Sequence, residues 1–591
     1  MAQHSQKRQL ILLCAFLLFI LVGLLWIIAP SRSLAIFPSI GGVPPTPKDS
    51  WYPSILKRLQ ILGGLTIAVS IIGILLRERI WHYLSSTWQE LFQTAKRGIV
   101  LLRDSMRQED RWHLVALALL LGIAFVFRLV VLVRLPFTND EARSFNDFAS
   151  QPLYVLISAY STTNNHVFMN LLVHFIYGIF GNEVWIIRLP SFIAGVLTVP
   201  AVYIATRRLY NKNAALLAVA FVTPLGFLAE YGALARGYAI ITFVFLVILI
   251  LATYLINGRN PALWLIFIVL SALGLYTIPV MLYPFGIVAL WLGTSIIVEG
   301  KDRKGSILEL MKAMIAIGML TLFLYAPVLL ISGIHALIAN PWVSPMRWSD
   351  FIAQVGPFLI SVWNAATGGF PAILVALTLV GFGASFLFHT KISPYKAPLG
   401  VIGIIWCAVV LFAERGIIGE RIWLFTLPFY YLLCAAGLAY LISLIAHSSP
   451  RTVISTAILG VLIAVVFSVE YVGQSAENDG PSAPEKVALF LLNTFRPGDI
   501  IESQFPTRPL SIYYFEKHGG SRNYFNARYA NVADVLEAAE RLLVIVDAQY
   551  APVTAAVPAK YADGTPVTPY LLFEYDHWQV YTVQKQPIQT F

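Results

Sequence analysis

Charged side chains are scarce in this chain. Asp, Glu, Lys and Arg make up 12% of its 591 residues, whereas about a quarter of the residues of a soluble domain are charged. The hydrophobic share is 58% and the mean hydropathy is +0.73. Apolar runs of close to twenty residues recur along most of the sequence, which is about what a helix needs to cross a hydrocarbon core of roughly 30 Å. The composition excludes a soluble protein and indicates a polytopic α-helical membrane protein.

Cysteine is nearly absent, and so are repeats. The three cysteines, Cys14, Cys407 and Cys434, all lie inside apolar runs, which argues against a disulfide framework or a metal cluster. No internal repeat of fixed period and no low-complexity tract is evident. The formal net charge of +10 suggests nucleic-acid binding at first sight. However, Lys and Arg concentrate in short loops between apolar runs, as the positive-inside rule predicts for cytoplasmic loops, so no nucleic-acid partner is expected.

The order of apolar runs and basic loops predicts about thirteen spans in a chain of three parts. Residues 1–112 hold two transmembrane helices and a basic cytoplasmic segment. Residues 113–473 form a transmembrane module with a long first outer loop at 136–187. Residues 474–591 form a small extracytoplasmic α/β domain, because their pattern changes to short helices and strands.

Individual elements are predicted within this frame. The third span, near Leu114–Val133, leaves the cytoplasm, so the loop after it is expected outside. Later spans are expected at about 214–227, 238–256, 263–276, 280–298, 307–331, 370–388, 399–412, 422–442 and 452–469. The stretch "HVFMNLLVHFIYGIFG" within that loop predicts a helix embedded at the interface. In the last part we expect helices at 482–495 and 531–542, strands at 498–505 and 542–548, and a hairpin at 570–583 that turns at Asp576–His577.

Ionisable side chains gather at the expected outer ends of the spans. Such groups are costly at membrane depth and mark function by default. Carboxylates can accept a proton, and arginine suits phosphate because its planar fork donates two parallel hydrogen bonds. An alternative for each residue is an ordinary polar loop or an arginine that reaches for lipid headgroups. The set comprises Asp140, Glu141, Arg143, His166, Arg188, Glu230, Arg236, Glu414, Arg415, Glu420 and Arg421.

Several segments resemble those of a known superfamily. They are "FTNDEARSF", "NNHVFMNLLVHFIYGIFGNEVWIIRLPSFIAGVLTVPAVYIATRRLY", "YGALARGYAIITF" and, more weakly, "LGLYTIPVMLYPF" and "ERIWLFTLPFYYLL". In this order and on this side of the membrane they resemble the GT-C glycosyltransferases, in the branch of the protein O-mannosyltransferases and the lipid A aminoarabinose transferase. The resemblance covers roughly residues 113–470. It implies an integral membrane enzyme that takes its sugar from a polyprenyl phosphate such as undecaprenyl phosphate.

The resemblance implies catalytic roles for the acidic pair. The Asp of the family's motif, which is the proposed base, corresponds to Asp140, and Glu141 would position it or bind acceptor or metal. Arg143 lies close enough in sequence to pair with either carboxylate. The sequence identifies no cofactor. A divalent cation held by Asp140, Glu141 and His166 is left open.

Further residues are expected to bind the substrates. We expect Arg236 and Arg421 to hold the donor phosphate, with Arg188 behind them. The remaining candidates for substrate contact are Arg143, Asn165, His166, Tyr238 and Tyr276. Alternatives are a buried structural arginine at Arg188, ordinary interfacial aromatics at the two tyrosines, and a satisfied histidine at His166.

The predicted function is therefore transfer of a sugar from a polyprenyl phosphate to an extracytoplasmic acceptor, which is a lipid, a glycan or a protein. A single displacement at the anomeric carbon would invert its configuration. The expected place is a bacterial inner membrane, among membrane lipids. Departures from the family pattern at Leu234, Ile278 and Val167–Phe168 leave the sugar and the acceptor open.

Two other functions compete with transfer. A transporter or lipid flippase would also place charges along a substrate path, but it predicts charges near the midplane and internal pseudo-symmetry. The sequence instead collects its charges at one face. The remaining alternative is a non-catalytic scaffold protein in which the Asp-Glu pair is incidental.

Overall fold

A computed structural model describes most of the chain. The described residues are 2–28, 52–79, 81, 86, 89–94, 96–98, 109–338, 345–368, 370–446, 466, 482–503, 506–526, 534–535, 541–561 and 565–583. Two compact units divide the chain. The first comprises Met1–Leu132, Pro152–Leu171 and Pro190–Gly473, and the second comprises Val133–Gln151, Leu172–Leu189 and Gln474–Phe591.

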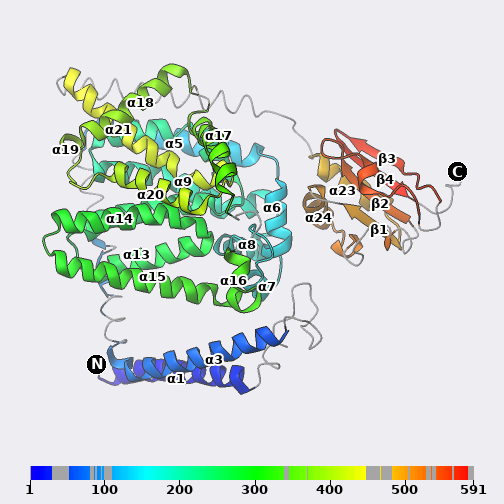
Figure 1. The fold of residues 1–591 in the computed structure, drawn as a ribbon, viewed down its shortest axis with the longest axis horizontal. Coiled ribbons are helices and arrows are strands. Elements are labelled where there is room, and N and C mark those ends of the chain that lie inside the picture. The colour runs from blue at the N-terminus through cyan, green and yellow to red at the C-terminus, as the bar shows by residue number, and fades with distance from the viewer. Residues whose placement is uncertain are drawn as a thin grey trace. The chain divides into compact units, whose positions relative to one another are not determined.

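The first unit is built from helices, many of them long and apolar (Figure 1). Three helices, α5, α8 and α9, run across the unit boundaries. The longer helices are α1 (Ala2–Ile28), α3 (Tyr52–Leu75), α5 (Arg111–Arg134), α8 (Val167–Phe180), α9 (Val184–Leu209), α10 (Lys212–Val222), α11 (Gly226–Ala233), α12 (Tyr238–Leu255), α13 (Pro261–Thr277), α14 (Leu282–Glu299), α15 (Arg303–Ile331), α17 (Trp348–Thr367), α18 (Ala372–Leu387), α20 (Leu399–Glu414) and α21 (Thr426–Ala446). Short elements are α7 (Leu153–Ser158), η2 (Pro279–Met281), α16 (Ile334–Ile338), α19 (His389–Ile392) and η4 (Glu420–Trp423).

The helices confirm a multi-pass membrane protein, but not the count of thirteen spans. Among the described residues, seven helices are long and apolar enough to cross a membrane, or nine if each of two bent pairs is one span. The predicted spans at 263–276 and 399–412 correspond to helices of 17 and 16 residues, α13 and α20. The last predicted span, Thr452–Val469, lies almost wholly outside the described residues.

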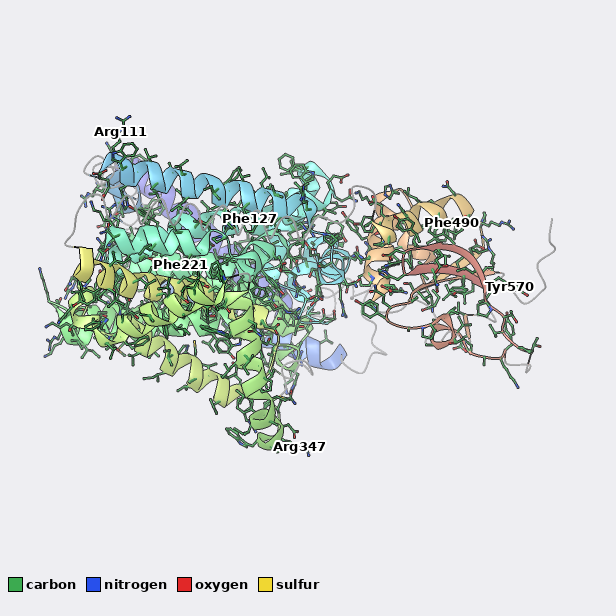
Figure 2. All side chains as sticks on the ribbon, turned by 90° about the horizontal axis from the view of Figure 1, so that it is seen from above. Arg111, Phe127, Phe221, Arg347, Phe490 and Tyr570 are labelled. Atoms are coloured by element: carbon green, nitrogen blue, oxygen red, sulfur yellow. The ribbon has the colours of Figure 1, made fainter. Side chains whose placement is uncertain are left out.

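Close helix approaches in the first unit depend on glycine. A Cβ at Gly195 of α9 would lie 2.9 Å from the Cα of Gly232 in α11. A Cβ at Gly437 of α21 would collide with the backbone of Gly381 in α18. Small residues allow such contact between backbones inside a membrane. Figure 2 draws the side chains on the helices and labels Phe127 of α5 and Phe221 of α10, both of which are buried.

Two elements differ from the sequence expectations. The predicted span Ala214–Phe227 corresponds to two helices, α10 and α11, which meet at a 71° bend. Pro224 lies in the break, where it has no N–H to continue the helical hydrogen bonds, and the backbone leaves helical geometry at Leu225 (φ −66°, ψ 103°). Helix α17 was not predicted, since Pro357 stands in its interior and proline normally argues against a continuous helix.

The second unit contains the C-terminal part, which folds as a four-stranded sheet of order β1-β2-β4-β3. Strand β2 pairs parallel with β1 and antiparallel with β4, and β4 pairs antiparallel with β3. The elements are α23 (Ala483–Thr494), β1 (Asp499–Ser503), α24 (Thr507–Lys517), η5 (Arg522–Tyr524), β2 (Arg541–Asp547), α26 (Val553–Ala556), β3 (Tyr570–Tyr575) and β4 (Trp578–Val583).

The sequence predicted most of this sheet. The first helix, the two strands and the hairpin are confirmed, and Asp576 adopts φ +56° at the hairpin turn. Every residue of β2 is buried, as expected for a short apolar run in the centre of a sheet. Helix α24 was not predicted. The helix expected at 531–542 lies outside the described residues except at 534–535 and 541–542, and the last two belong to β2.

Two stretches of the first outer loop also belong to the second unit. The first includes α6 (Asn139–Ser144) and a π-helical turn, η1 (Phe145–Ala149). The second includes the C-terminal part of α8, the helix that "HVFMNLLVHFIYGIFG" predicted, and the first turns of α9. Helix α24 packs against α6 and η1, so the acidic motif and the sheet domain share one compact unit.

Candidate functional site

The acidic motif occupies the first turn of α6. Thr138 is the N-cap: its backbone N–H and its hydroxyl both donate to Glu141 Oε2, each at 3.0 Å. The amide of Glu141 donates back to Thr138 Oγ1 at 3.4 Å. This is a capping box, which a Thr-x-x-Glu sequence favours because each side chain satisfies an orphan amide of the helix end. The helix start therefore fixes Glu141 through its own carboxylate.

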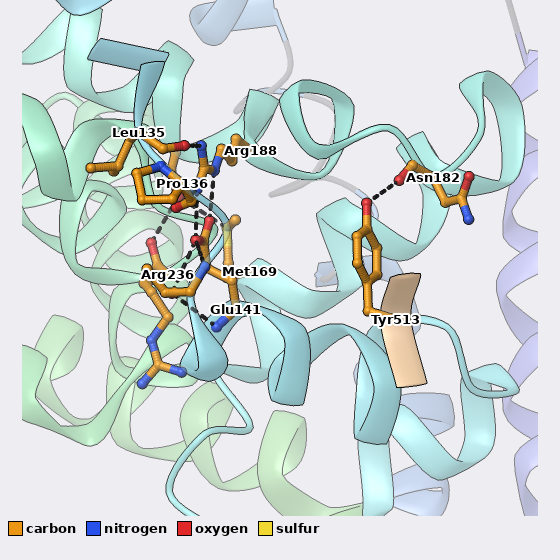
Figure 3. Close-up of polar contacts among 10 residues, drawn as sticks. Leu135, Pro136, Glu141, Met169, Asn182, Arg188, Arg236 and Tyr513 are labelled. Atoms are coloured by element: carbon orange, nitrogen blue, oxygen red, sulfur yellow. Dashed lines mark hydrogen bonds and ion pairs between the residues drawn. The ribbon is translucent and has the colours of Figure 1, made fainter. Parts of the chain in front are cut away.

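Glu141 is also bound on its other side by Arg188 (Figure 3). The guanidinium donates from Nε to Oε1 and from Nη2 to Oε2, both at 2.8 Å. It donates further to the carbonyl oxygens of Leu135 and Pro136, at 2.7 and 2.8 Å. The two side chains are 0% and 1% exposed. The geometry favours a positioning role for this pair, so for Arg188 it supports the structural alternative.

Asp140 lies beside this buried pair and is itself half-buried. Arg143 forms an ion pair with Asp147 one turn further on, with 3.5 Å between Nε and Oδ2. The expected pairing of Arg143 with Glu141 is not what the structure has, because Arg188 takes that carboxylate. The motif thus has one buried acid that is held in place and one acid nearer the surface.

A second group of polar residues lies in the first unit, around His166. The backbone N–H of Gly237 donates to His166 Nδ1 at 2.9 Å. Burial, and then the charges of Arg236 and Arg421, hold the pKa of the His166 imidazole well below its ordinary value. The ring is therefore neutral, and because Nδ1 accepts a hydrogen bond the proton sits on Nε2. His166 is a hydrogen-bond donor of fixed tautomer.

Arg236 and Arg421 are distant from His166 in the sequence but lie near its imidazole in the structure. Arg236 is 3% exposed, donates from Nη2 to Asn164 Oδ1 at 3.3 Å, and lies over the ring of Tyr238 at 5.9 Å. Its carbonyl oxygen accepts from Ser191 Oγ at 2.8 Å, which fixes the backbone at the start of α12. The structure thus brings three predicted site residues together: His166, Arg236 and Tyr238.

Arg421 joins the same group from η4. It forms a side-chain hydrogen bond with Tyr231, whose ring lies 5.6 Å from that of Tyr238, edge to face. The Tyr238 ring in turn lies 5.2 Å from the His166 ring. Arginines, a neutral donor and aromatic rings in one place are suited to an anionic group that carries an apolar or sugar substituent.

The remaining predicted contacts have other partners. The Asn165 amide donates to the carbonyl oxygens of Leu156 and Ala159, at 2.9 and 2.6 Å, and accepts from Asn170 at 3.0 Å. Tyr276 packs edge to face on the Tyr325 ring at 5.2 Å, in a buried apolar cluster. Substrate contact by Asn165 or Tyr276 stays a prediction.

Sequence reasoning missed Asn164, Tyr231, Ser191 and Gly237. Tyr231 opens the quoted segment "YGALARGY", and Asn164 precedes the quoted Asn-His pair, so their proximity to known motifs was the available signal. Asp140 belongs to the second unit, whereas Arg236 and Arg421 belong to the first. The expected convergence of acid and arginines stays a prediction.

The metal alternative finds no support in the geometry. Within the described ranges, no group of three or more His, Cys, Asp or Glu side chains is arranged to hold a metal ion. Glu141, one of the three expected ligands, has its carboxylate bound by Arg188 and Thr138. No step of the chemistry below is assigned to a cation.

Comparison with known proteins bears on the family and the fold. Residues 164–331 match the family described as dolichyl-phosphate-mannose-protein mannosyltransferase. No curated protein matches the sequence. The structure is similar to the crystal structure of ArnT from Cupriavidus metallidurans in the apo state, with a TM-score of 0.54 at 11% sequence identity. The match covers 79% of this chain and 97% of that chain.

ArnT from the same organism bound to undecaprenyl phosphate gives a TM-score of 0.52, also at 11% identity and over the same shares of both chains. At this identity the likeness to ArnT shows the fold. The matched family segment contains His166, Arg188, Arg236 and Tyr238 but not Asp140, Glu141 or Arg421. The family match and the fold agree with the resemblance found in the sequence motifs, and the described helices are those of a multi-pass membrane protein.

Proposed function

We propose that this protein transfers a sugar from a polyprenyl phosphate to an acceptor on the extracytoplasmic side of a bacterial inner membrane. The description of the matched family, with its dolichyl-phosphate mannose, supports a lipid phosphate as donor. So does the structural neighbour bound to undecaprenyl phosphate. The acceptor is a lipid, a glycan or a protein, and the sugar a pentose, aminopentose or hexose.

The observation that carries the proposal is the group of side chains around the buried His166: the Tyr238 ring lies 5.2 Å from the imidazole, and the Arg236 guanidinium lies over that tyrosine at 5.9 Å. Arg236 and Arg421 both lower the pKa of His166 after burial itself, so both positive charges lie near the same ring. Cations brought together in a poorly solvated site raise each other's energy. A doubly or singly charged phosphate offsets that repulsion, and Nε2 of His166 would add a neutral hydrogen bond.

The chemistry then follows from the groups assigned to it. The acceptor oxygen attacks the anomeric carbon while the bond from that carbon to the phosphate oxygen breaks. The bonding electrons leave with the lipid phosphate, whose growing charge Arg236 and Arg421 stabilise. Asp140 takes the proton of the acceptor hydroxyl as the new bond forms, and the single displacement inverts the anomeric centre. Glu141 and Arg188 hold the turn from which Asp140 projects.

Binding of undecaprenyl phosphate to the full chain in lipid nanodiscs tests the phosphate site. We expect Arg421→Ala to weaken binding about 10- to 100-fold, because a hydrogen bond to a charged group contributes about 1.5–3 kcal/mol. Arg415→Ala is the matched control, since Arg415 lies in the same connection and contacts the Trp348 ring. Equal binding by Arg421→Ala and the control would refute the assignment.

Transfer tests the base. Radiolabelled undecaprenyl-phosphate pentose, aminopentose and hexose are supplied with lipid A, polysaccharide or peptide acceptors. We expect Asp140→Asn to lower transfer at least about 100-fold while undecaprenyl phosphate binding is unchanged. Near-normal turnover would remove Asp140 from the mechanism. Lipid moved across the membrane of closed proteoliposomes without release of sugar would instead indicate a flippase.

A further inference from the structure

The acidic motif of this protein is held by its C-terminal domain as well as by Arg188. Tyr513 of α24 is 1% exposed, and its ring lies 4.4 Å from that of Phe137 and 5.6 Å from that of Phe145. Its hydroxyl donates to the carbonyl oxygen of Asn182 at 2.6 Å (Figure 3). One tyrosine therefore touches residues before and after α6 and also the connection into α9.

Arg522 forms a second contact with the same loop. Glu516 fixes the guanidinium by accepting from Nε and Nη2, each at 2.6 Å. From this fixed position Nη1 donates to the carbonyl oxygen of Asn146 at 3.1 Å, and Nη2 donates to Ser150 Oγ at 3.4 Å. In return, the Asn146 side chain donates to the carbonyl oxygen of Pro509 at 2.8 Å.

These contacts lie at the π-helical turn η1, where they include hydrogen bonds to the backbone carbonyl oxygen of Asn146. The amide of Ser150 donates to Phe145 and that of Gln151 to Phe148, so neither takes the carbonyl oxygen of Asn146. A buried carbonyl without a partner is costly. The carbonyl oxygen of Asn146 accepts from Arg522 at 3.1 Å, from the side chain of Gln151 at 2.7 Å and from Ser150 Oγ at 3.3 Å. Of these three donors, Arg522 is the one that comes from the C-terminal part. π turns are rare, and their hydrogen-bond pattern often marks functional sites.

We infer that the C-terminal domain positions the catalytic acid of this enzyme, through Arg522 and Tyr513 acting on the continuous segment Asn139–Ala149. This inference rests on the proposed role of Asp140. Glu141 and Arg188 hold the start of the segment, and Arg522 holds its end. Loss of the distal contact frees η1 to return to ordinary helical bonding and turns the preceding α6 with it. Arg522 and Tyr513 are positioning residues, since neither is assigned to a substrate.

The experiment compares four full-length proteins in nanodiscs: wild type, Arg522→Ala, Arg522→Lys and Lys486→Ala. Lys486 is the matched control, because it lies over the Tyr575 ring, 3.5 Å from its centroid, within the sheet domain and on α23. Three quantities are measured: hydrogen exchange of the amides of residues 144–151, affinity for undecaprenyl phosphate, and transfer at saturating donor. The unfolding temperature of each variant checks that the protein is folded.

We expect Arg522→Ala to speed exchange in residues 144–151 about tenfold and to lower kcat about tenfold or more. Binding of undecaprenyl phosphate should stay within twofold (about the error of such measurements), because the phosphate residues belong to the first unit. Arg522→Lys should recover part of both losses, and Lys486→Ala neither. This combination separates a positioning role from a general loss of stability.

Two results would overturn the inference. One is unchanged exchange in residues 144–151 of Arg522→Ala, and the other is faster exchange with normal kcat. A raised KM for the acceptor with normal kcat would assign the domain to acceptor access instead. The exchange measurement needs no substrate. A wild-type protein that neither binds undecaprenyl phosphate nor transfers sugar would therefore refute the proposed function separately.

If Arg522→Ala does not fold, Tyr513→Leu tests the same inference from the other contact. It removes the aromatic ring that packs against Phe137 and Phe145, together with the hydrogen bond to the carbonyl oxygen of Asn182. The same gain in exchange is expected, and its absence would count against the inference.

Discussion

At the scale of single residues, this protein contains two kinds of charged group. Glu141 and Arg188 are buried and satisfy each other, whereas Arg143 and Asp147 form their ion pair near the surface, with side chains 34% and 47% exposed. Removal of one partner from a buried pair leaves an uncompensated charge, but exposed pairs contribute little. The two pairs lie on one short segment and so offer a matched comparison.

Glu141→Gln should therefore destabilise the protein far more than Arg143→Ala. Breaking a buried pair costs about 3–5 kcal/mol, and loss of an exposed pair about 0.2–1 kcal/mol. Thermal unfolding of both variants in detergent, followed by intrinsic fluorescence, should show a drop of several degrees for Glu141→Gln only. Equal unfolding temperatures would mean that the Arg188 contact does not hold the segment.

Ionisable site residues could be selected from the sequence because they interrupt apolar runs. Asp140, His166, Arg236 and Arg421 were found in this way, and the structure gathers the last three in one group. Uncharged partners such as Tyr231 carried no comparable signal in a chain with 27 tyrosines. The Glu141 carboxylate is bound by Arg188, which is distant in sequence. Only the tertiary structure could reveal that this carboxylate already has a partner.

At the scale of elements, the apolar run is a good guide to where a helix exists and a poor guide to where it bends. Composition marked the segment from α10 into α11 as one span, yet the chain turns by 71° there. Beyond the bend, Gly232 of α11 packs against Gly195 of α9. Arg236 follows closely after α11, so this contact fixes the helix that leads into the arginine.

Gly195→Ala should consequently lower the unfolding temperature, although alanine favours a helix by about 1 kcal/mol over glycine. Its Cβ would meet backbone at 2.9 Å, and backbone cannot move aside as a side chain can. Gly122→Ala in α5 is the control, because a Cβ there has nothing within 4 Å. We expect the control to be neutral or stabilising. An unaltered Gly195→Ala protein would show that α9 and α11 can separate without loss.

At the scale of the whole molecule, the sequence predicted a helical membrane protein with a C-terminal α/β domain, and both parts are present. The sequence predicted the number of spans less well than the fold class, because α13 and α20 have the composition of spans but only 17 and 16 residues. The sequence also did not indicate that loop stretches on both sides of α7 join the C-terminal part in one compact unit, because that depends on contacts between distant segments.

The sidedness of the molecule is open to a direct test. Alkaline phosphatase fused after Val583 should be active and green fluorescent protein at the same point dark, because the C-terminal domain is predicted outside. Fusions after Lys304, in a basic loop predicted inside, should give the opposite results. A fluorescent fusion after Val583 would reverse the predicted topology and place the acidic loop with the cytoplasmic face.

The hydrogen bond from Gly237 to His166 has a consequence for any titration of this enzyme. An imidazole that already accepts from a backbone amide cannot gain a second proton without breaking that bond, and two neighbouring guanidiniums oppose the gain as well. The lowered pKa of His166 therefore favours the neutral ring on mild acidification. The imidazole should accordingly contribute little of its own to any change of lipid affinity with pH.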